Sequence, residues 1–233
     1  MNLTDKVCVI TGASSGIGKE LAVQLLEKGA VVYGLSRRSP EINHPNFTFI
    51  TTNVRSFDAV KDAFDEILKK SPTVDVLINN AGLGYFGYIE DHTLEQWHEM
   101  FETNVNGIFY TSKLAVPMMK KQERGHIINI ASTAAIEGYP QVSGYCGTKF
   151  AVKGMSQSMY KEMRDFGVKV TCVYPGSVKT DFFRNSAIEV HDYMLMPADV
   201  AQMIVHALET PDNFHQVNLE VRPLQSKGPR KKS

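Results

Sequence analysis

Tyr145 and Lys149 are the residues whose types and spacing most directly suggest chemistry, because they stand four positions apart in Ser143-Gly-Tyr-Cys-Gly-Thr-Lys149. Residues four apart share one face of a helix, so the phenol and the ammonium would point the same way. An adjacent cation favours the ionised phenol and lowers its pKa from the usual value of about 10. Such a tyrosine could exchange a proton with an alcohol or carbonyl oxygen. A chain with nine tyrosines holds about 0.7 such pairs by chance, so the pattern needs independent support.

A glycine-rich segment near the start of the chain supplies that support. The β-branched run of residues 7–10 leads into Thr11-Gly-Ala-Ser-Ser-Gly-Ile-Gly18, and residues 19–28 continue with a helical pattern. This order predicts a strand, a turn and a helix. Gly12 would permit the tight turn, Gly16 would let a pyrophosphate approach the backbone, and Gly18 would let the helix pack closely on the strand. Amides at the helix N-terminus would then face the phosphates of a dinucleotide.

The tip of the second predicted strand, residues 31–35, indicates which dinucleotide fits. An acidic residue about twenty positions after the glycines would hold the ribose hydroxyls of NAD. This chain has Ser36-Arg37-Arg38 there instead. Guanidinium groups bind phosphate well, and no carboxylate stands beside them to repel it. We therefore expect NADP(H) rather than NAD(H), with the alternative that the two arginines only solvate a loop.

The same turn also satisfies a hydrolase pattern, because Gly12-Ala-Ser14-Ser-Gly16 has the form Gly-x-Ser-x-Gly. A nucleophile elbow of that kind lies at the top of a central sheet. Here the turn follows the first strand, which leaves no preceding chain to build such a sheet. A hydrolase would also leave Gly18 and the Tyr145–Lys149 pair unexplained, so the dinucleotide interpretation is preferred.

Four further segments follow in order along the chain. They are Asn79-Asn-Ala-Gly82, Asn104-Val-Asn-Gly107, Ile127-Ile-Asn-Ile-Ala-Ser132 and Tyr174-Pro-Gly-Ser-Val-Lys-Thr180. Together with the glycine turn and the Tyr-x-x-x-Lys pattern, they resemble the short-chain dehydrogenase/reductase family over residues 5–222. The resemblance implies an oxidoreductase that transfers hydride between a nicotinamide and a carbonyl or secondary alcohol.

The resemblance also implies a role for each matching residue. Tyr145 would be the general acid in carbonyl reduction and the base in alcohol oxidation, with Lys149 lowering its pKa and holding the nicotinamide ribose. Ser132 would hydrogen-bond the substrate oxygen, and Asn104 would support a water that relays protons. The residues implied at the cofactor are Gly12, Ser14, Ser15, Gly16, Ile17, Gly18, Ser36, Arg37, Arg38, Asn53, Val54, Asn80, Ala81, Gly82, Tyr145, Lys149, Pro175, Gly176, Val178 and Thr180.

The chain departs from the family pattern in three places. Asn53 stands where Asp is common, which weakens one contact to adenine but still allows a hydrogen bond from the amide. Ala131 replaces a common second serine and leaves Ser132 as the sole candidate. The stretch between Gly176 and Pro197 is short, so we expect a small lid over a compact, open pocket.

Composition and periodicity predict one α/β domain. The chain has 233 residues, of which 43% are hydrophobic, and predicted strands alternate with helices without a linker, which favours a single core. We expect residues 1–225 to form a Rossmann-type, doubly wound parallel sheet of about seven strands with helices on both faces. Residues 226–233 would form a disordered basic tail. Expected elements include helices at 94–121, opened by a Thr93–Gln96 capping box, at 146–166 and from Pro197 to 209, and a last strand at 216–221.

Charge and motif content argue against several other classes of protein. The formal net charge is zero, so there is no electrostatic case for nucleic acid or an anionic membrane as a partner. No apolar run approaches a membrane span, no signal peptide precedes the first strand, and three cysteines without a disulfide pattern fit a cytoplasmic protein. The seven histidines show no metal-ligand spacing, so no metal is expected. By resemblance, the two long helices would pair in a homodimer or homotetramer.

The leading hypothesis is an NADPH-dependent reductase of a small, uncharged, hydrophobic ketone or aldehyde, reversible as an alcohol dehydrogenase. Candidate pocket residues are Leu83, Tyr85, Phe86, Thr133, Tyr139, Phe182, Phe183, Tyr193 and Met194. The nearest alternative is a 3-oxoacyl-(acyl-carrier-protein) reductase, although Glu123 and Phe166 stand where such enzymes carry basic residues near the active-site entrance. A nucleotide-sensing protein without chemistry is a further alternative, against which the complete catalytic set counts.

Overall fold

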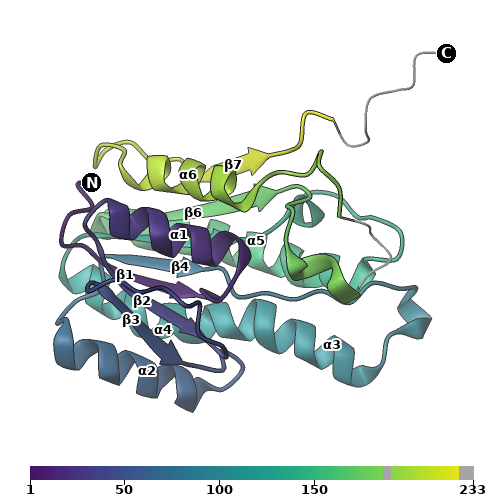
Figure 1. Cartoon of the computed structure of the whole chain (residues 1–233), viewed down its shortest axis with the longest axis horizontal. Helices are drawn as coiled ribbons and strands as arrows, with labels where there is room; N and C mark the ends of the chain where they lie inside the picture. The colour runs from purple at the N-terminus through teal and green to yellow at the C-terminus, as the bar shows by residue number, and fades with distance from the viewer. Residues whose placement is uncertain (186–189, 226–233) are drawn as a thin grey trace.

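The computed structural model describes residues 1–185 and 190–225, and within them seven strands form one parallel sheet (Figure 1). The strands are β1 (Val7–Thr11), β2 (Val31–Ser36), β3 (Phe47–Thr51), β4 (Val76–Asn79), β5 (Gly125–Ile130), β6 (Val168–Pro175) and β7 (Asn218–Val221). Their order across the sheet is β3-β2-β1-β4-β5-β6-β7, and each neighbouring pair is parallel. The predicted doubly wound, Rossmann-type sheet is confirmed. The predicted basic tail, residues 226–233, lies outside the described residues.

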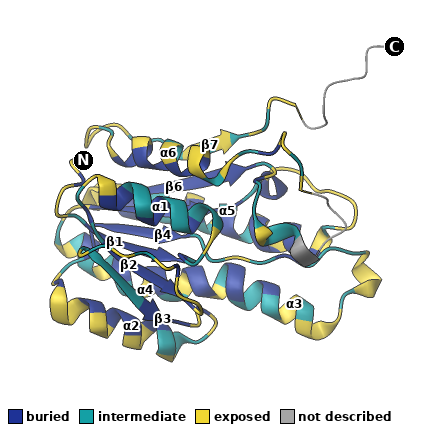
Figure 2. Ribbon diagram, in the orientation of Figure 1, coloured by how far each residue is buried: buried dark blue, intermediate teal, exposed yellow. Residues whose placement is uncertain are grey.

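Helices cover both faces of the sheet (Figure 1). α1 (Gly16–Glu27) and α6 (Pro197–Leu208) pack on one face, and α2 (Phe57–Lys70), α4 (Gly107–Lys121) and α5 (Ser143–Met163) pack on the other. Alternate residues of one strand serve the two sides, since Cys8 and Ile10 pack with α1 whereas Val7 and Val9 pack with α2. Burial on both faces is why the strands read as continuous apolar runs. Figure 2 shows the central strands mainly in dark blue, and yellow, exposed residues along α2 and α6.

The long helix predicted for residues 94–121 contains one irregular turn. α3 (Leu94–Phe101) begins with the predicted capping box, in which Thr93 and Gln96 hydrogen-bond each other's backbone. Between α3 and α4 the residues Glu102–Asn106 form a π-helix. Such turns are rare and lie mostly at functional sites. Asn104 lies in this π-helix, so the irregular turn sets the position of a side chain predicted to be catalytic.

Other boundaries differ from the prediction by a few residues. α5 begins at Ser143 rather than at residue 146, so Tyr145 lies in its first turn. β7 begins at Asn218 rather than at residue 216. Pro197 is the first residue of α6, as predicted. Over the described ranges no helix is both long enough and apolar enough to cross a membrane.

A buried histidine lies at the amino end of β5, at the edge of the sheet away from the strands' carboxyl ends. His126 is 1% exposed. Its Nε2 lies 2.8 Å from the Thr171 hydroxyl, and its ring centroid is 6.0 Å from that of His215. Burial lowers the pKa of His126 to about 3, and the positive charges of His215 and Lys169 act in the same direction. The folded protein therefore keeps this ring neutral at pH values where a histidine of the unfolded chain takes up a proton.

We predict that His126 makes the folded protein sensitive to acid. Because its folded pKa is depressed, its contribution to stability is complete above about pH 6.5 and is lost progressively as the pH falls toward about 3. Between about pH 7 and about pH 5 this group alone should lower the unfolding free energy by about 2 kcal/mol. Urea unfolding at both pH values measures the loss, which should shrink by that amount in His126→Gln. The exposed His206→Gln is the control, and an equal loss in both variants would contradict the assignment.

Candidate active site

The carboxyl ends of the strands open into a cavity of about 920 Å³. In doubly wound sheets ligands bind at this edge, where the strand order reverses, here between β1 and β4. The cavity is lined by the turn after β1, the tip of β2, the segments after β4, β5 and β6, and the first turns of α5. It gathers every residue predicted for catalysis or cofactor binding except Gly18 and Asn104, which are buried outside its lining.

The glycine turn is interlocked with the segment that follows β4. Gly12 has a φ of +67°, a left-handed conformation that glycine adopts without strain, which confirms the tight turn predicted there. The Asn80 side-chain amide donates to the carbonyls of Thr11 (3.1 Å) and Gly12 (3.0 Å). Gly18, in the first turn of α1, lies so close to this turn that a Cβ on it would be 2.3 Å from the Gly12 carbonyl oxygen. The close packing predicted for Gly18 is therefore confirmed.

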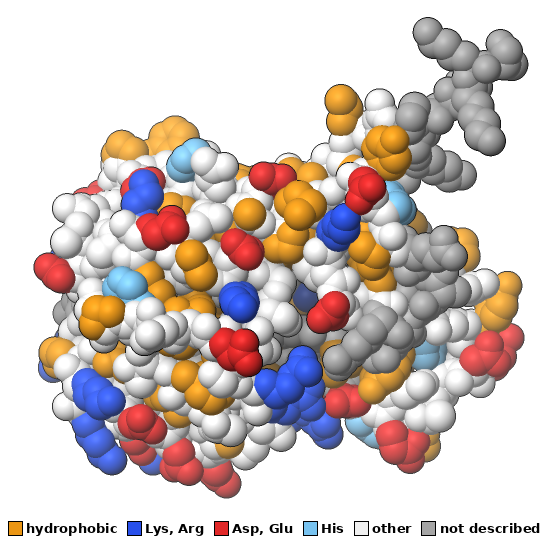
Figure 3. Space-filling model, viewed as in Figure 1, with side chains coloured by type: hydrophobic (Ala, Val, Ile, Leu, Met, Phe, Trp, Pro, Cys, Tyr) orange, Lys and Arg blue, Asp and Glu red, His pale blue; other side chains and the backbone are white. Residues whose placement is uncertain are grey.

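The two arginines at the tip of β2 have no partner within the described part of the chain. Arg37 and Arg38 are exposed and line the cavity, and their guanidinium groups make no hydrogen bond or ion pair with another described residue. The Ser36 hydroxyl donates to the Arg38 carbonyl at 2.7 Å and so shapes the turn that carries them. Acidic and basic side chains are interspersed over much of the face seen in Figure 3.

Tyr145, Lys149 and Ser132 meet on one wall of the cavity. Tyr145 is 7% exposed and Lys149 is 4% exposed. The Lys149 Nζ donates to the Ile130 carbonyl at 2.9 Å and lies 5.6 Å from the centroid of the Tyr145 ring. Ser132 accepts a hydrogen bond from the Ala134 amide, which fixes the serine at the start of its turn. The i, i+4 pair therefore shares a face, as the spacing predicts.

The electrostatics of this wall differ from the sequence prediction. Burial raises the pKa of Tyr145 above its ordinary value, and interaction with the Ser132 hydroxyl offsets only part of that shift. Burial also lowers the pKa of Lys149 to about 8. The expectation that the pKa of Tyr145 is lowered is thus wrong in its net direction, because desolvation of the phenol outweighs its interaction with Ser132.

The buried Asn104 side chain hydrogen-bonds two segments that line or carry the cavity wall. Its Nδ2 donates to the Leu83 carbonyl (2.8 Å) and to the Thr148 hydroxyl (3.0 Å), and its Oδ1 accepts from the Leu83 amide (2.9 Å). The side chain therefore joins the segment after β4 to the helix that carries Tyr145. The proton relay expected at Asn104 stays a prediction.

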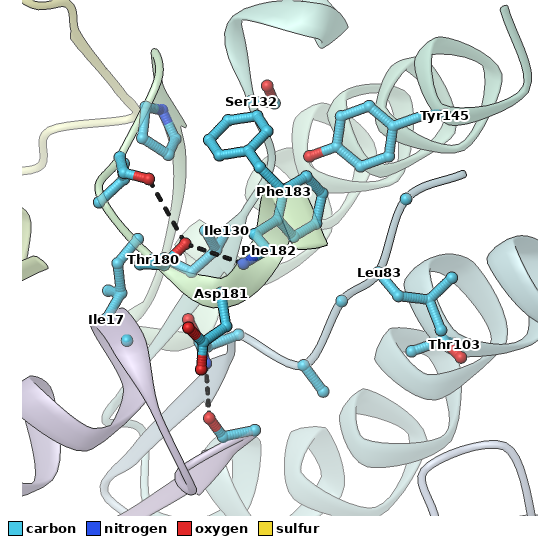
Figure 4. Close-up of a pocket in the computed structure, with 18 of the residues that line it drawn as sticks. Ile17, Leu83, Thr103, Ile130, Ser132, Tyr145, Thr180, Asp181, Phe182 and Phe183 are labelled. Atoms are coloured by element: carbon cyan, nitrogen blue, oxygen red, sulfur yellow. Dashed lines mark hydrogen bonds between the residues drawn. The ribbon is translucent and has the colours of Figure 1, made fainter. Parts of the chain in front are cut away.

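Aromatic rings pack beside Tyr145. The Phe182 ring centroid lies 5.4 Å from that of Tyr145, and the Phe86 centroid lies 6.0 Å from both. Figure 4 shows the rings of Phe182 and Phe183 beside the Tyr145 phenol. The expected small lid lies partly outside the described residues, and the open pocket stays a prediction; within the described residues the helical turn Asp181–Asn185 carries Phe182, which packs beside Tyr145.

Most of the predicted substrate residues line the cavity, and two do not. The lining contains Leu83, Tyr85, Phe86, Thr133, Tyr139, Phe182 and Phe183. Met194 and Tyr193 are absent from the lining. Met194 is buried in the protein, and Tyr193 packs against His191. Within the described residues no three His, Cys, Asp or Glu side chains gather as metal ligands.

One polar network in the cavity is missing from the sequence prediction. The Tyr85 hydroxyl donates to Glu99 at 2.6 Å, and Arg55 pairs with Glu99 at 3.1 Å and with Glu102 at 2.8 Å. The network connects the segment after β3 with the segment after β4 through α3. Arg55 lies two residues after Asn53, but no local pattern indicates which carboxylates it meets.

The positions expected to meet an acyl carrier lie elsewhere. Glu123 precedes β5 and Phe166 precedes β6, so both are at the amino ends of strands whose carboxyl ends carry the cavity. Phe166 instead packs against Lys120, whose Nζ is 4.2 Å from the ring centroid. The expectation that these positions flank the entrance is wrong within one chain, because the length of a strand separates them from it.

Comparisons with known proteins agree with this geometry. The family model for short chain dehydrogenase matches residues 6–190. An uncharacterized oxidoreductase of Staphylococcus saprophyticus is 32% identical and aligns over 95% of this chain and 97% of its own.

Solved structures align over nearly the whole chain. ElxO with NADP bound has a TM-score of 0.85 and 28% identity, covering 94% of this chain and 98% of its own. An alcohol dehydrogenase from the archaeon Thermococcus sibiricus complexed with 5-hydroxy-NADP has a TM-score of 0.87 and 27% identity, covering 96% and 99%. A 3-ketoacyl-(acyl-carrier-protein) reductase from Brucella melitensis complexed with NADH has a TM-score of 0.88 and 25% identity, covering 97% and 100%.

The geometry of the glycine turn predicts that Gly18 tolerates no side chain. In Gly18→Ala the new Cβ would lie 2.3 Å from the Gly12 carbonyl oxygen and 2.4 Å from the Asn80 Nδ2. Either the turn or the Asn80 amide must move, and overpacking of this kind destabilises by about 1–3 kcal/mol. Urea unfolding measures the effect. Gly154→Ala on α5 is the matched control, because nothing lies within 4 Å of a Cβ there. It should leave stability unchanged or raise it by up to about 1 kcal/mol, and equal effects at the two positions would refute the packing argument.

Proposed function

The chain belongs to the short-chain dehydrogenase family, and on that premise we propose that it is an NADP(H)-dependent oxidoreductase acting on a carbonyl or its alcohol. The observation that carries the proposal is one buried phenol, Tyr145, which meets the Ser132 hydroxyl in the same cavity as the Lys149 ammonium. The substrate would be a small, uncharged, hydrophobic ketone or aldehyde.

The cavity has the groups that NADP(H) requires. Arg37 and Arg38 line it with guanidinium groups that have no partner among the described residues, and a 2′-phosphate would supply one. The turn before α1 exposes backbone amides where a pyrophosphate would lie. A Cβ at Gly16 would be 3.0 Å from the Thr180 methyl group on the opposite wall, so glycine leaves that passage clear.

Hydride would be supplied by the bound NADPH, and the residues of the chain would control the proton and the geometry. Because burial raises the pKa of Tyr145, the phenol stays protonated near neutral pH, which suits a general acid in carbonyl reduction. Ser132 would donate a hydrogen bond to the substrate oxygen as negative charge develops on it. In alcohol oxidation, Tyr145 would first have to lose its proton, and its phenolate would then accept the proton of the alcohol, with the nearby Lys149 ammonium stabilising the phenolate.

The surroundings of Tyr145 favour an apolar substrate. Leu83, Phe86, Phe182 and Phe183 form the wall next to the phenol, and apolar walls bind apolar groups through their burial. Phe182 packs beside Tyr145, with ring centroids 5.4 Å apart, so a substrate at the hydroxyl would lie next to this ring.

A 3-oxoacyl-(acyl-carrier-protein) reductase is the second candidate. Its support is the structural likeness to the Brucella reductase. The position of Glu123 and Phe166 at the far edge of the sheet removes the sequence argument against it within one chain. Turnover of 3-oxoacyl thioesters in preference to small ketones would favour this candidate.

We further propose that the protein forms a homodimer or homotetramer through α4 and α5. Phe109 on α4 and Phe150 on α5 are 52% and 44% exposed. Large apolar side chains exposed on adjacent helices are typical of protein interfaces. Sedimentation equilibrium would test this, and a monomer at micromolar concentration would contradict it.

We predict that Tyr145→Phe abolishes turnover while NADPH binding stays nearly intact, because the substitution removes one hydroxyl and preserves the packing of the ring. Acid–base groups typically contribute about 100-fold or more to the rate. Lys149→Ala should impair both turnover and NADPH binding. Tyr160→Phe is the control, since this tyrosine of α5 packs against His215 outside the cavity. Turnover above about a tenth of wild type in Tyr145→Phe would show that the phenol is not the acid.

We predict that Arg37 sets the preference for NADPH over NADH. A charge-assisted hydrogen bond to phosphate contributes about 1.5–3 kcal/mol, so the wild type should favour NADPH by about 10-fold to 100-fold. Arg37→Ala should remove most of that preference with little change in NADH binding, and Arg38 accounts for any preference that remains. The measurement is the ratio of the two dissociation constants at fixed salt, with Arg164→Ala as a control outside the cavity. An unchanged ratio, or a wild type that prefers NADH, would overturn the assignment.

A further inference from the structure

The segment between the two catalytic side chains needs to be held in place. We call residues 136–142 the connecting loop, because it joins the turn that follows Ser132 to the first turn of α5, which carries Tyr145. Glu137 and Tyr139 of this loop are exposed. One end of the loop is tied by the Gly87 amide, which donates to the Gln141 carbonyl at 2.8 Å. The other end has no backbone bond to a distant strand among the described residues.

Arg222, which follows the edge strand β7, contacts the connecting loop at its other end, near Glu137. The Gly176 amide donates to the Val221 carbonyl at 2.8 Å, so the chain leaving β7 runs beside the carboxyl end of β6. A Cβ at Gly176 would lie 3.0 Å from Pro223 and 3.5 Å from the Arg222 Cα. The missing side chain at Gly176 therefore lets residues 222–223 pass close to the cavity, and Arg222 lines it.

Arg222 connects two carboxylates across this edge. Its Nε donates to Glu220 at 2.6 Å and its Nη1 donates to Glu137 at 2.9 Å, although Glu137 lies 85 residues earlier in the chain. The Tyr139 hydroxyl donates to the same Glu137 oxygen at 2.5 Å. Tyr139 also lines the cavity. The Glu137 carboxylate thus links Tyr139, which lines the cavity, to Arg222, which follows β7.

These contacts are too exposed to matter much for global stability. The side chains of Arg222, Glu137 and Glu220 are 44%, 50% and 45% exposed, and exposed ion pairs typically contribute little to folding. The consequence of the Arg222–Glu137 contact is therefore local. It determines where the connecting loop, and Tyr139 with it, lies at the mouth of the cavity.

We propose that Arg222 is a positioning residue for the substrate, which holds Tyr139 at the mouth of the cavity through Glu137. The inference rests on the proposed reductase function, because it assigns a substrate role to that cavity. Loss of the contact lets the connecting loop move outward and leaves the substrate less tightly enclosed. Proton transfer and NADP(H) binding use other residues, so the effect falls on the substrate's KM.

Kinetics of three variants and one control variant test the role in substrate binding. With the carbonyl compound that the wild type reduces best, Arg222→Ala and Glu137→Ala should each raise KM about fivefold, with kcat within about twofold and the dissociation constant of NADPH unchanged. The double variant should match either single variant, because each single substitution already removes the Arg222–Glu137 contact. Glu220→Ala is the matched control: it removes the local partner of Arg222, keeps the contact to Glu137 and should leave KM unchanged. Additive effects, or an equal effect of Glu220→Ala, would overturn the proposal.

Hydrogen exchange followed by mass spectrometry tests the contact without any turnover. Amides of the connecting loop should exchange about fivefold faster in Arg222→Ala than in the wild type, and Glu220→Ala should match the wild type. Unchanged exchange in Arg222→Ala overturns the proposal even if no carbonyl compound is reduced, an outcome that by itself counts against the proposed function only. Faster exchange with an unchanged KM overturns the substrate role.

Discussion

The interlock between the turn after β1 and the segment after β4 is the constraint on which the rest of the site depends. Asn80 donates two hydrogen bonds into the turn, and the Thr11 hydroxyl accepts from the amides of Asn80 and Ala81 at 3.0 Å each. Gly18 has no room for a Cβ at this point. Parallel strands end at a common edge, but their register alone does not set the distance between the loops that leave them. Here side-chain hydrogen bonds set that distance, and the cavity opens beside them.

The chain from Asn80 to Leu83 and a series of hydrogen bonds carry this placement to α5, the helix that contains Tyr145 and Lys149. Leu83 lies three residues after Asn80, and its backbone amide and carbonyl both hydrogen-bond the Asn104 side chain. The same side chain donates to the Thr148 hydroxyl. Thr148 in turn donates to the Tyr145 carbonyl at 2.7 Å. A buried polar side chain that satisfies its hydrogen bonds in one arrangement specifies that arrangement, since any other leaves a polar group unpaired. The phenol is therefore placed relative to the cofactor turn by polar contacts as well as by packing.

The parts of the site that follow from short spacing were predictable from the sequence, and the parts that follow from tertiary packing were not. Glycines in a strand–turn–helix order predict the left-handed Gly12 and the crowded Gly18, and an i, i+4 pair predicts the shared face of Tyr145 and Lys149. The π-helix at Asn104 has no local signal in the sequence. The raised pKa of Tyr145 depends on burial in the folded chain, and Phe182, which packs against it, is 37 positions later in the sequence. Arg222 reaches Glu137 only because β7 lies beside β6, a contact that no local pattern encodes.

In the proposed reaction, hydride is transferred in this cavity between a nicotinamide and a carbonyl carbon, and Tyr145 transfers the proton. The most direct measurement uses NADPH carrying deuterium at the transferable position of the nicotinamide. A panel of small ketones, aldehydes and 3-oxoacyl thioesters is incubated with the enzyme, and the products are read by NMR. We expect deuterium on the carbinol carbon of a small, uncharged, hydrophobic ketone or aldehyde. NADPH binding with no deuterium in any product of the panel would contradict the claim and favour a protein that binds the nucleotide without chemistry.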